Sequence, residues 1–168
     1  LNFFSKVETE ILDSKSKNKK IINIIVEEKP TGEIMAGAGV GTGGGTVVFG
    51  VSENNFLGRG IEFSSDVKFS TETLKGVISL NNPNFKGSNR SLNATLESTV
   101  TDRLTNFGYK SNKTGFSVGS GFEFYDDLYW NTGISSYVEK LDTDSTASTN
   151  MKKQEGSYFD TFFNQTFS

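Results

Sequence analysis

From residue 31 to its end, the chain alternates apolar and polar side chains with a period of two, and this pattern constrains the fold most. Residues 61–70 are typical, since Ile61, Phe63 and Val67 share one face and charged or hydroxyl side chains the other. Such alternation predicts β-strands with a single apolar face. It recurs in about eight stretches of about 8–11 residues, at residues 34–41, 46–52, 61–70, 74–81, 92–100, 116–124, 130–139 and 158–167.

The first 29 residues have a different pattern of polar and apolar side chains. Residues 6–12 alternate, residues 13–20 are polar and rich in Ser and Lys, and residues 21–26 (IINIIV) are almost continuously apolar. Two strands joined by a polar turn are expected there, and Pro30 ends the second because it cannot donate to a strand ladder. We therefore expect residues 1–29 to be the closing hairpin of a small α/β module, and residues 30–168 to form a separate β-domain.

Composition narrows the possible chemistry. The 168 residues include no Cys and no His, which excludes disulfides, thiol nucleophiles, imidazole bases and histidine metal ligands. Acidic residues outnumber basic ones, 20 against 17, which argues against a nucleic-acid partner. The carboxylates are scattered along polar strand faces without an isolated pair. We expect no catalytic residue, no cofactor and no metal site, and hence no enzyme.

Two architectures produce this alternation: a soluble β-sandwich, and a membrane barrel whose apolar face meets lipid. The strand lengths suit a tilted crossing of a bilayer. The joins at residues 54–60, 82–88 and 126–127 are compact, whereas those at 101–113 and 142–154 are long and polar, with short exceptions at 42–45 and 70–73. Short turns at one end and long loops at the other are typical of outer-membrane barrels, and we favour that fold.

Four sequence elements resemble the BamA-type family of outer-membrane assembly proteins, at the junction between its last POTRA domain and its barrel. They are EKPTG at residues 28–32, the glycine-alternating IMAGAGVG at 34–41, ENNFLGRG at 53–60 and NNPNF at 81–85. Their order and spacing agree with that family. The resemblance implies an antiparallel up-and-down transmembrane β-barrel portion, about eight strands of a larger barrel. It makes the chain a fragment, with residues 1–29 periplasmic and the rest in the bacterial outer membrane.

The resemblance also implies a mechanism. The first barrel strand would form a weak seam at which client barrel proteins add their strands, because its second face is nearly bare of side chains. The residues assigned to this seam are Glu33, Ile34, Met35, Ala36, Gly37, Ala38, Gly39, Val40 and Gly41. The implied partners are unfolded outer-membrane proteins, accessory assembly lipoproteins that bind POTRA domains, and membrane lipid. The alternative for the glycines is that they only relieve crowding in a curved wall.

Two family turn motifs carry the remaining assigned residues. The residues of both motifs are expected to form tight turns with a structural role. Arg59 can also pair with a carboxylate or a lipid headgroup. The residues are Asn55, Phe56, Leu57, Gly58, Arg59 and Gly60 in the first motif and Asn82, Pro83 and Phe85 in the second. Three other functions stay open: a passive porin or transporter barrel, a related translocation factor (TamA-type or two-partner secretion), and a soluble β-sandwich binding module.

Overall fold

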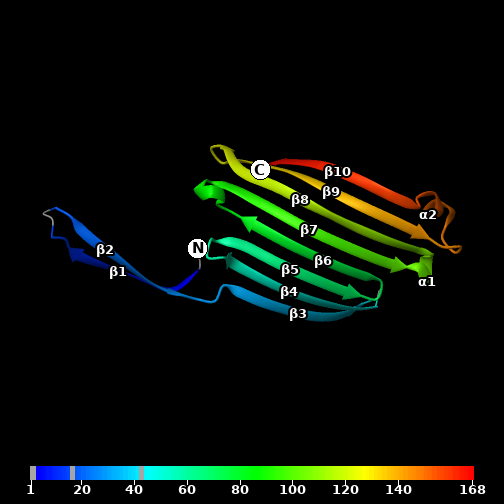
Figure 1. Cartoon of the computed structure of the whole chain (residues 1–168), viewed down its shortest axis with the longest axis horizontal. Coiled ribbons are helices and arrows are strands. Elements are labelled where there is room, and N and C mark those ends of the chain that lie inside the picture. The colour runs from blue at the N-terminus through cyan, green and yellow to red at the C-terminus, as the bar shows by residue number, and fades with distance from the viewer. Residues whose placement is uncertain (1–2, 16–17, 42–43) are drawn as a thin grey trace. The chain divides into compact units, whose positions relative to one another are not determined.

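The computed structural model describes residues 3–15, 18–41 and 44–168, and its elements divide into two compact units (Figure 1). The first unit spans Leu1–Gly32 and the second Glu33–Ser168. In the described residues, both units are built from antiparallel strands joined in sequence order. None of the helices in this part of the chain is long and apolar enough to cross a membrane.

The first unit is a hairpin of β1 (Phe4–Asp13) and β2 (Lys20–Glu28). Its register pairs Val7 with Val26 and Ile11 with Ile22. An ion pair between Lys20 and Asp13 closes the turn end, and the amide of Lys29 donates to the carbonyl of Phe3 at 3.1 Å at the open end. The two strands predicted at residues 6–12 and 21–26 are therefore present, each a little longer than expected.

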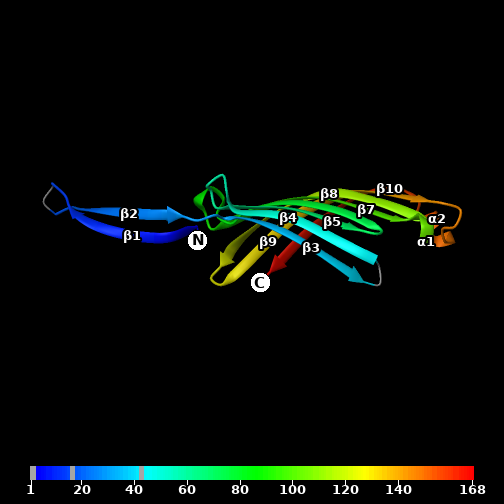
Figure 2. The same ribbon diagram turned by 90° about the horizontal axis from the view of Figure 1, so that it is seen from below.

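The second unit is one eight-stranded sheet. Its strands lie side by side in chain order, each antiparallel to the next, so the predicted up-and-down architecture is confirmed. Figure 2 shows that this sheet is curved, with its edge strands β3 and β10 bending toward the same side. The strands are β3 (Gly32–Gly41), β4 (Gly44–Phe56), β5 (Ile61–Ser70), β6 (Thr73–Asn82), β7 (Arg90–Arg103), β8 (Tyr109–Tyr125), β9 (Leu128–Thr143) and β10 (Gly156–Phe167).

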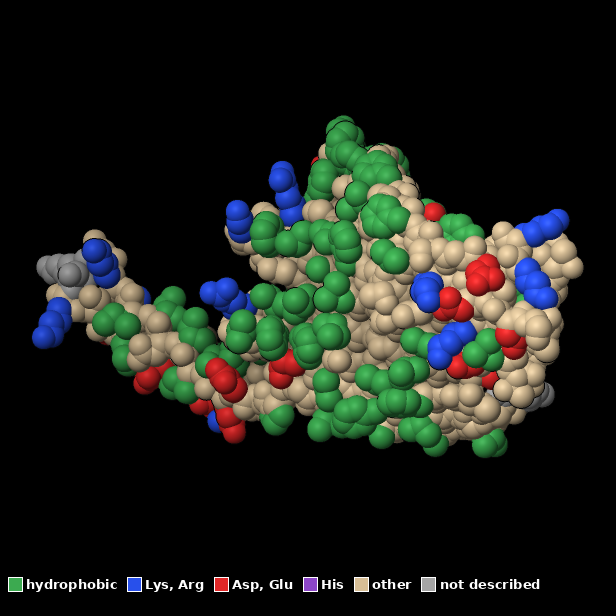
Figure 3. Space-filling model, turned by 45° about the vertical axis from the view of Figure 1, so that its right-hand side comes forward, with side chains coloured by type: hydrophobic (Ala, Val, Ile, Leu, Met, Phe, Trp, Pro, Cys, Tyr) green, Lys and Arg blue, Asp and Glu red, His purple; other side chains and the backbone are tan. Residues whose placement is uncertain are grey.

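The register places the apolar side chains on one face, which we call the outward face. Residues opposite each other in an antiparallel pair share a face, and one such row runs across the sheet through Leu80, Ala94, Val118, Ile134 and Phe163. These side chains are not covered by a second layer: Ile134 is 45% exposed and Phe163 is 68% exposed. Figure 3 shows hydrophobic side chains spread over the surface of the sheet.

The core that a soluble sandwich requires is missing from the described residues. Their buried hydrophobic side chains are Leu141 and Ala147 alone, and no large side chain among them is fully buried. A sandwich would instead cover the apolar face with a second sheet about 10 Å away. An outward apolar face without such a cover suits lipid as its solvent.

One sequence prediction about the connections is wrong. Residues 101–113 do not form a long loop, because β7 continues to Arg103, the short helix α1 (Leu104–Phe107) makes the turn, and β8 begins at Tyr109. Beyond the apolar band both faces of a strand are polar, so the period-two signal disappears although the pairing continues. As a result β7, β8 and β9 have 14, 17 and 16 residues, more than the expected 8–11.

The other connections agree better with expectation. The join at residues 126–127 is a two-residue turn with Asp127 at φ 59°. Residues 144–155 lie outside the strands and contain helix α2 (Thr149–Lys153). The 3₁₀ turn η1 (Phe85–Gly87) occupies the join between β6 and β7. Residues 42 and 43, in the short join predicted at 42–45, lie outside the described residues.

Candidate functional site: an exposed strand edge

All nine residues assigned to the seam lie in β3, and β3 is an edge strand of the sheet. One side of β3 is hydrogen-bonded to β4. On its other side no strand of the described residues pairs with it, so that edge presents a row of backbone N–H and C=O groups. Every residue of β3 is exposed.

The two faces of β3 differ in what they offer a neighbour. The Met35 methyl group lies 3.5 Å from the place that a Cβ on Gly50 would occupy, which puts Met35 on the inward face of the sheet. Gly37, Gly39 and Gly41 follow on that face by the period of two. A Cβ added to any of these three glycines would meet no atom within 4 Å. The inward face of β3 therefore has almost no side-chain contact with the rest of the sheet.

A hollow of about 580 Å³ opens beside the glycines on the inward face. Gly39 and Gly41 form part of its wall, and three basic side chains, Lys68, Lys75 and Arg103, form another part. Lys75 pairs with Glu97 at 3.5 Å, between Nζ and Oε2. The first strand thus borders a charged, open space rather than packed side chains.

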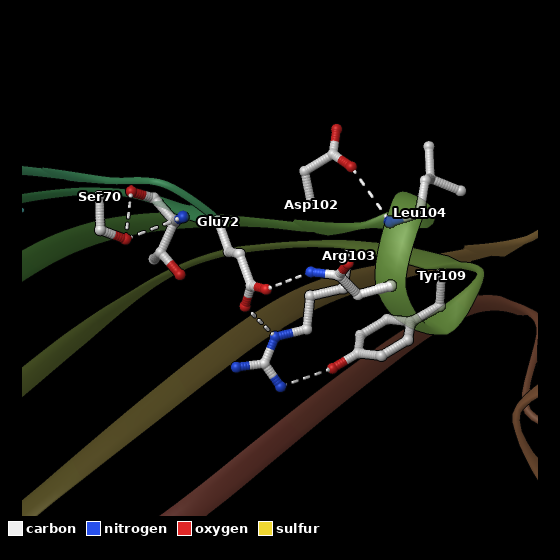
Figure 4. A network of polar contacts seen from close by, with 8 residues as sticks. Ser70, Glu72, Asp102, Arg103, Leu104 and Tyr109 are labelled. Carbon is white, nitrogen blue, oxygen red and sulfur yellow. Dashed lines mark hydrogen bonds and ion pairs between the residues drawn. The ribbon is translucent and has the colours of Figure 1, made fainter. Parts of the chain in front are cut away.

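A network around Arg103 joins the turn between β5 and β6 to the ends of β7 and β8 (Figure 4). The guanidinium donates from Nε to Oε2 of Glu72 at 2.6 Å and from Nη1 to the hydroxyl of Tyr109 at 3.3 Å. Asn106 donates to the second Glu72 oxygen at 3.1 Å, and the Arg103 guanidinium lies 5.6 Å from the ring centre of Phe107. This network fixes the strand ends next to the hollow.

Sequence reasoning missed this network. Glu72 and Arg103 are 31 positions apart, and each by itself is an ordinary charged residue next to a turn. The register of β6 and β7 brings them together, since Thr73 faces Thr101. One sequence signal could have indicated this ion pair: Glu72 and Arg103 have opposite charges and lie near the ends of neighbouring predicted strands.

The first turn motif is organised by Asn55. Its carbonyl accepts from the Gly58 amide at 2.8 Å, and its side-chain Oδ1 accepts from the Gly60 amide at 2.7 Å. Gly58 and Gly60 have φ of 67° and 63°, conformations in which glycine carries no steric cost, and Leu57 joins them at 59°. Phe56 stacks on Phe63 with ring centres 5.3 Å apart. The segment is a tight turn, as its residue types predict.

The second turn motif has its own local hydrogen bonds. Asn82 accepts from the Asn84 amide at 3.2 Å through Oδ1, and the Ser88 hydroxyl donates to the Phe85 carbonyl at 2.7 Å. Pro83 lies between Asn82 and Asn84, outside the strand ladder, where its lack of a backbone N–H breaks no hydrogen bond between strands. Both motifs lie at the same end of the sheet, far along the strands from the Arg103 network.

The loop after β9 is also held by local bonds. Asp144 accepts from Thr146 at one carboxylate oxygen, from the hydroxyl at 2.6 Å and from the amide at 2.7 Å. These bonds, the hydroxyl bond first, lower the pKa of Asp144 below its ordinary value of 3.8. This carboxylate belongs to a turn, and in the described residues no group of three or more acidic side chains could hold a metal ion.

The arrangement around β3 suits the binding of another strand through backbone hydrogen bonds rather than catalysis by side chains. Carboxylates near the hollow are engaged with basic or amide side chains, as in Glu72 with Arg103 and Glu97 with Lys75. The groups left for a partner at β3 are the amides and carbonyls of the strand edge. Such an edge binds another strand by β-augmentation.

Comparisons with known proteins agree with this architecture. The crystal structure of BamA from Haemophilus ducreyi lacking POTRA domains 1–3 matches with a TM-score of 0.73 and 23% sequence identity, over 98% of this chain and 34% of that one. The present chain thus spans about a third of that relative, and the likeness establishes the fold. A search of curated proteins gave no match. The Omp85 superfamily domain matches residues 55–168, and the chain belongs to this family of non-enzymatic outer-membrane assembly and translocation proteins.

Proposed function

We propose that the chain is part of a factor that inserts β-barrel proteins into the bacterial outer membrane, and that β3 is the edge on which client strands are templated. The observation that carries this proposal is the bare inward face of β3, the first strand of the described sheet. Family membership supports assembly or translocation in general. The structure of β3 favours assembly by strand addition.

The physical reason is the cost of opening the seam. A seam opens when ladder hydrogen bonds and the side-chain contacts across it are lost together. Side-chain pairs across strands contribute roughly 0.2–1 kcal/mol each, and Gly37, Gly39 and Gly41 make none on the inward face. By contrast, β10 carries Tyr158, Phe162 and other full side chains at its inward positions. A strand that pairs with β3 therefore gains little from the inward face, which makes this pairing easier to exchange.

We further propose that the hairpin β1–β2 is the end of a POTRA domain on the periplasmic side and that accessory lipoproteins act through such domains. Its support is the separate compact unit Leu1–Gly32 and the match to a BamA structure that lacks POTRA domains 1–3. Clients and lipoproteins are partners proposed for the whole protein, of which this chain is one part.

The test is to give β3 the side chains that it lacks. Gly37→Val and Gly39→Val place β-branched residues where a Cβ meets open space, so the fold should accept them. Each should strengthen strand pairing by up to about 1 kcal/mol, which is about fivefold in the ratio of closed to open seam. We expect the double variant in the full-length protein to insert normally and to slow client-barrel assembly, measured as folded client in reconstituted vesicles.

The matched control is Gly76→Val. Gly76 lies in the interior strand β6, and an added Cβ there also meets no atom within 4 Å. Client assembly should continue at the wild-type rate in this variant. Wild-type assembly in a properly inserted Gly37→Val/Gly39→Val variant would sink the proposal that the bare face of β3 matters.

A further inference from the structure

Three basic side chains project at the end of the sheet that carries the turn motifs. Arg59 lies in the turn between β4 and β5, Lys86 in η1, and Arg90 is the first residue of β7. All three are exposed. None of them forms an ion pair with a carboxylate of the described residues, and we call the three together the basic rim.

The topology places the basic rim on neighbouring hairpins. The β4–β5 and β6–β7 turns emerge at the same end of the sheet, with strands β5 and β6 between them. Adjacent strands are about 4.8 Å apart, so the two turns are separated by about 10 Å. That distance suits one lipid headgroup or two neighbouring ones.

Aromatic rings lie directly under two of the three charges. The Lys86 ammonium is 5.4 Å from the ring centre of Phe85, and the Arg90 guanidinium is 5.4 Å from that of Phe122. Phe122 lies opposite Arg90 in the register and packs edge-on against Trp130 at 5.5 Å. Aromatic girdles mark the two bilayer interfaces of membrane barrels. The basic rim thus lies at the height of the lipid headgroups.

The basic side chains at the other end of the outward face are paired instead. Lys110 lies 3.0 Å from Asp102, and Lys140 lies 2.8 Å from Asp142. Figure 3 shows acidic and basic side chains intermixed at one end of the sheet, and at the other end basic side chains that project beside hydrophobic ones, with acidic side chains nearby. The two ends of the barrel wall therefore meet their leaflets with different charge.

Three of the carboxylates at the end with the turn motifs lie on the β8–β9 hairpin, whereas Glu53 of β4 lies opposite Phe63 on the outward face and accepts from the Asn55 amide at 2.7 Å. Asp126 and Asp127 form the β8–β9 turn, and Glu123 accepts from the Asp127 amide at 3.1 Å. Glu123 pairs with Tyr129 on the inward face, whereas Arg90 pairs with Phe122 on the outward face. The outward charge of Arg90 is therefore not neutralised by Asp126, Asp127 or Glu123.

We propose that the basic rim of Arg59, Lys86 and Arg90 binds the phosphate of anionic phospholipids in the periplasmic leaflet, beside the proposed seam. Each basic group near an anionic leaflet contributes about a fivefold preference for the charged lipid. The nearby rings anchor the acyl region, while the guanidinium and ammonium groups reach the phosphate. The wall next to β3 thereby gathers anionic lipid in one leaflet.

Trp130 provides the measurement because it is the single tryptophan of the 168 residues and contacts Phe122. The full-length protein, in a background where Trp130 is the only tryptophan, is reconstituted in bilayers that contain brominated phosphatidylglycerol or brominated phosphatidylcholine. We expect the anionic lipid to quench Trp130 more strongly, and high salt to reduce the difference because it screens exposed charge. Arg59→Gln/Lys86→Gln/Arg90→Gln should bring the two quenching efficiencies together.

The matched control removes three positive charges from the opposite end: Lys110→Gln/Lys140→Gln/Lys152→Gln. This variant should keep the lipid selectivity of the wild type. Single Arg90→Gln, which should lose part of the selectivity, serves if the triple variant fails to insert. Equal quenching by both lipids in the wild type, or unchanged selectivity in the rim variants, would overturn the proposal.

The inference rests on the membrane placement given under the proposed function, but the assay separates the two. If the membrane placement is wrong, neither brominated lipid will quench Trp130, and the basic-rim proposal falls with it. If the seam mechanism alone is wrong, lipid selectivity will persist while client assembly ignores the β3 substitutions.

Discussion

At the scale of single residues, the same residue type has opposite roles in this sheet. The glycines of β3 border empty space, whereas a Cβ on Gly115 would collide with the carbonyl oxygen of Ser136 and the ring of Tyr137. In β8 the missing side chain is what lets the Tyr137 ring lie over the neighbouring strand. Glycine count alone cannot separate these cases, because the difference lies in what faces each position.

This contrast predicts opposite effects of alanine. Gly115→Ala should lower the free energy of unfolding by roughly 1–3 kcal/mol, because the backbone carbonyl of Ser136 cannot move aside cheaply. Gly39→Ala should leave it unchanged or raise it by up to about 1 kcal/mol. Urea unfolding of the inserted protein, followed by Trp130 fluorescence, measures both. Equal destabilisation by the two substitutions would contradict the assigned environments.

The Asp144 turn predicts a defined pH dependence. Because folding lowers the pKa of Asp144 below 3.8, its ionised form stabilises the turn above that pH, and the contribution is lost as pH falls through the lowered pKa. Thr146→Val removes the hydroxyl donor, so the pKa of Asp144 should rise toward 3.8. Carboxyl NMR titration measures the shift. Thr143→Val, whose hydroxyl bonds Glu155 instead, should leave the pKa of Asp144 as it was.

At the scale of elements, the Arg103 network ties one turn to a neighbouring hairpin. Glu72 receives two donors from β7 and α1, and its side chain is only 24% exposed. Glu72→Ala should lower the free energy of unfolding by roughly 0.5–1 kcal/mol and speed amide exchange in α1. Asp142→Ala breaks an ion pair between two half-exposed partners and should have no measurable effect. Similar effects of the two substitutions would argue against a structural role for the network.

Much of the element pattern could be predicted from the sequence, because one face of each strand is apolar. The eight strands and the two-residue turn at 126–127 follow from alternation and turn chemistry alone. The parts of β7 and β8 next to α1 could not be predicted in this way. Polar residues such as Asp102 and Lys110 occupy a face there that is apolar further along each strand. The Arg103 network depends on register, which the sequence pattern leaves open.

At the scale of the whole molecule, one curved sheet with an outward apolar face assigns its two ends to the two sides of a membrane. If the hairpin β1–β2 is periplasmic, as proposed, the turns at 57–60 and 126–127 would be periplasmic as well, and α1 and α2 would be at the cell surface. A chain without cysteine allows clean labelling of this topology.

We expect Thr105→Cys, in the exposed α1, to react with a membrane-impermeant maleimide on intact cells. Asp126→Cys, in the turn at the other end, should react only after the outer membrane is opened. Reaction of Asp126→Cys on intact cells together with protection of Thr105→Cys would reverse the orientation and, with it, the leaflet assigned to the basic rim.

The most direct test of the central claim is to ask whether a client strand lies against β3 during assembly. Single cysteines at Ala36, Ala38 and Val40 in the full-length protein would be paired with cysteines in the terminal strand of a stalled client, and disulfide formation measured. We predict cross-links that shift by two residues on β3 when the client position shifts by two, with none from the interior position Ile78 in β6. Cross-links absent from β3, or equally frequent at Ile78, would contradict templating at this edge.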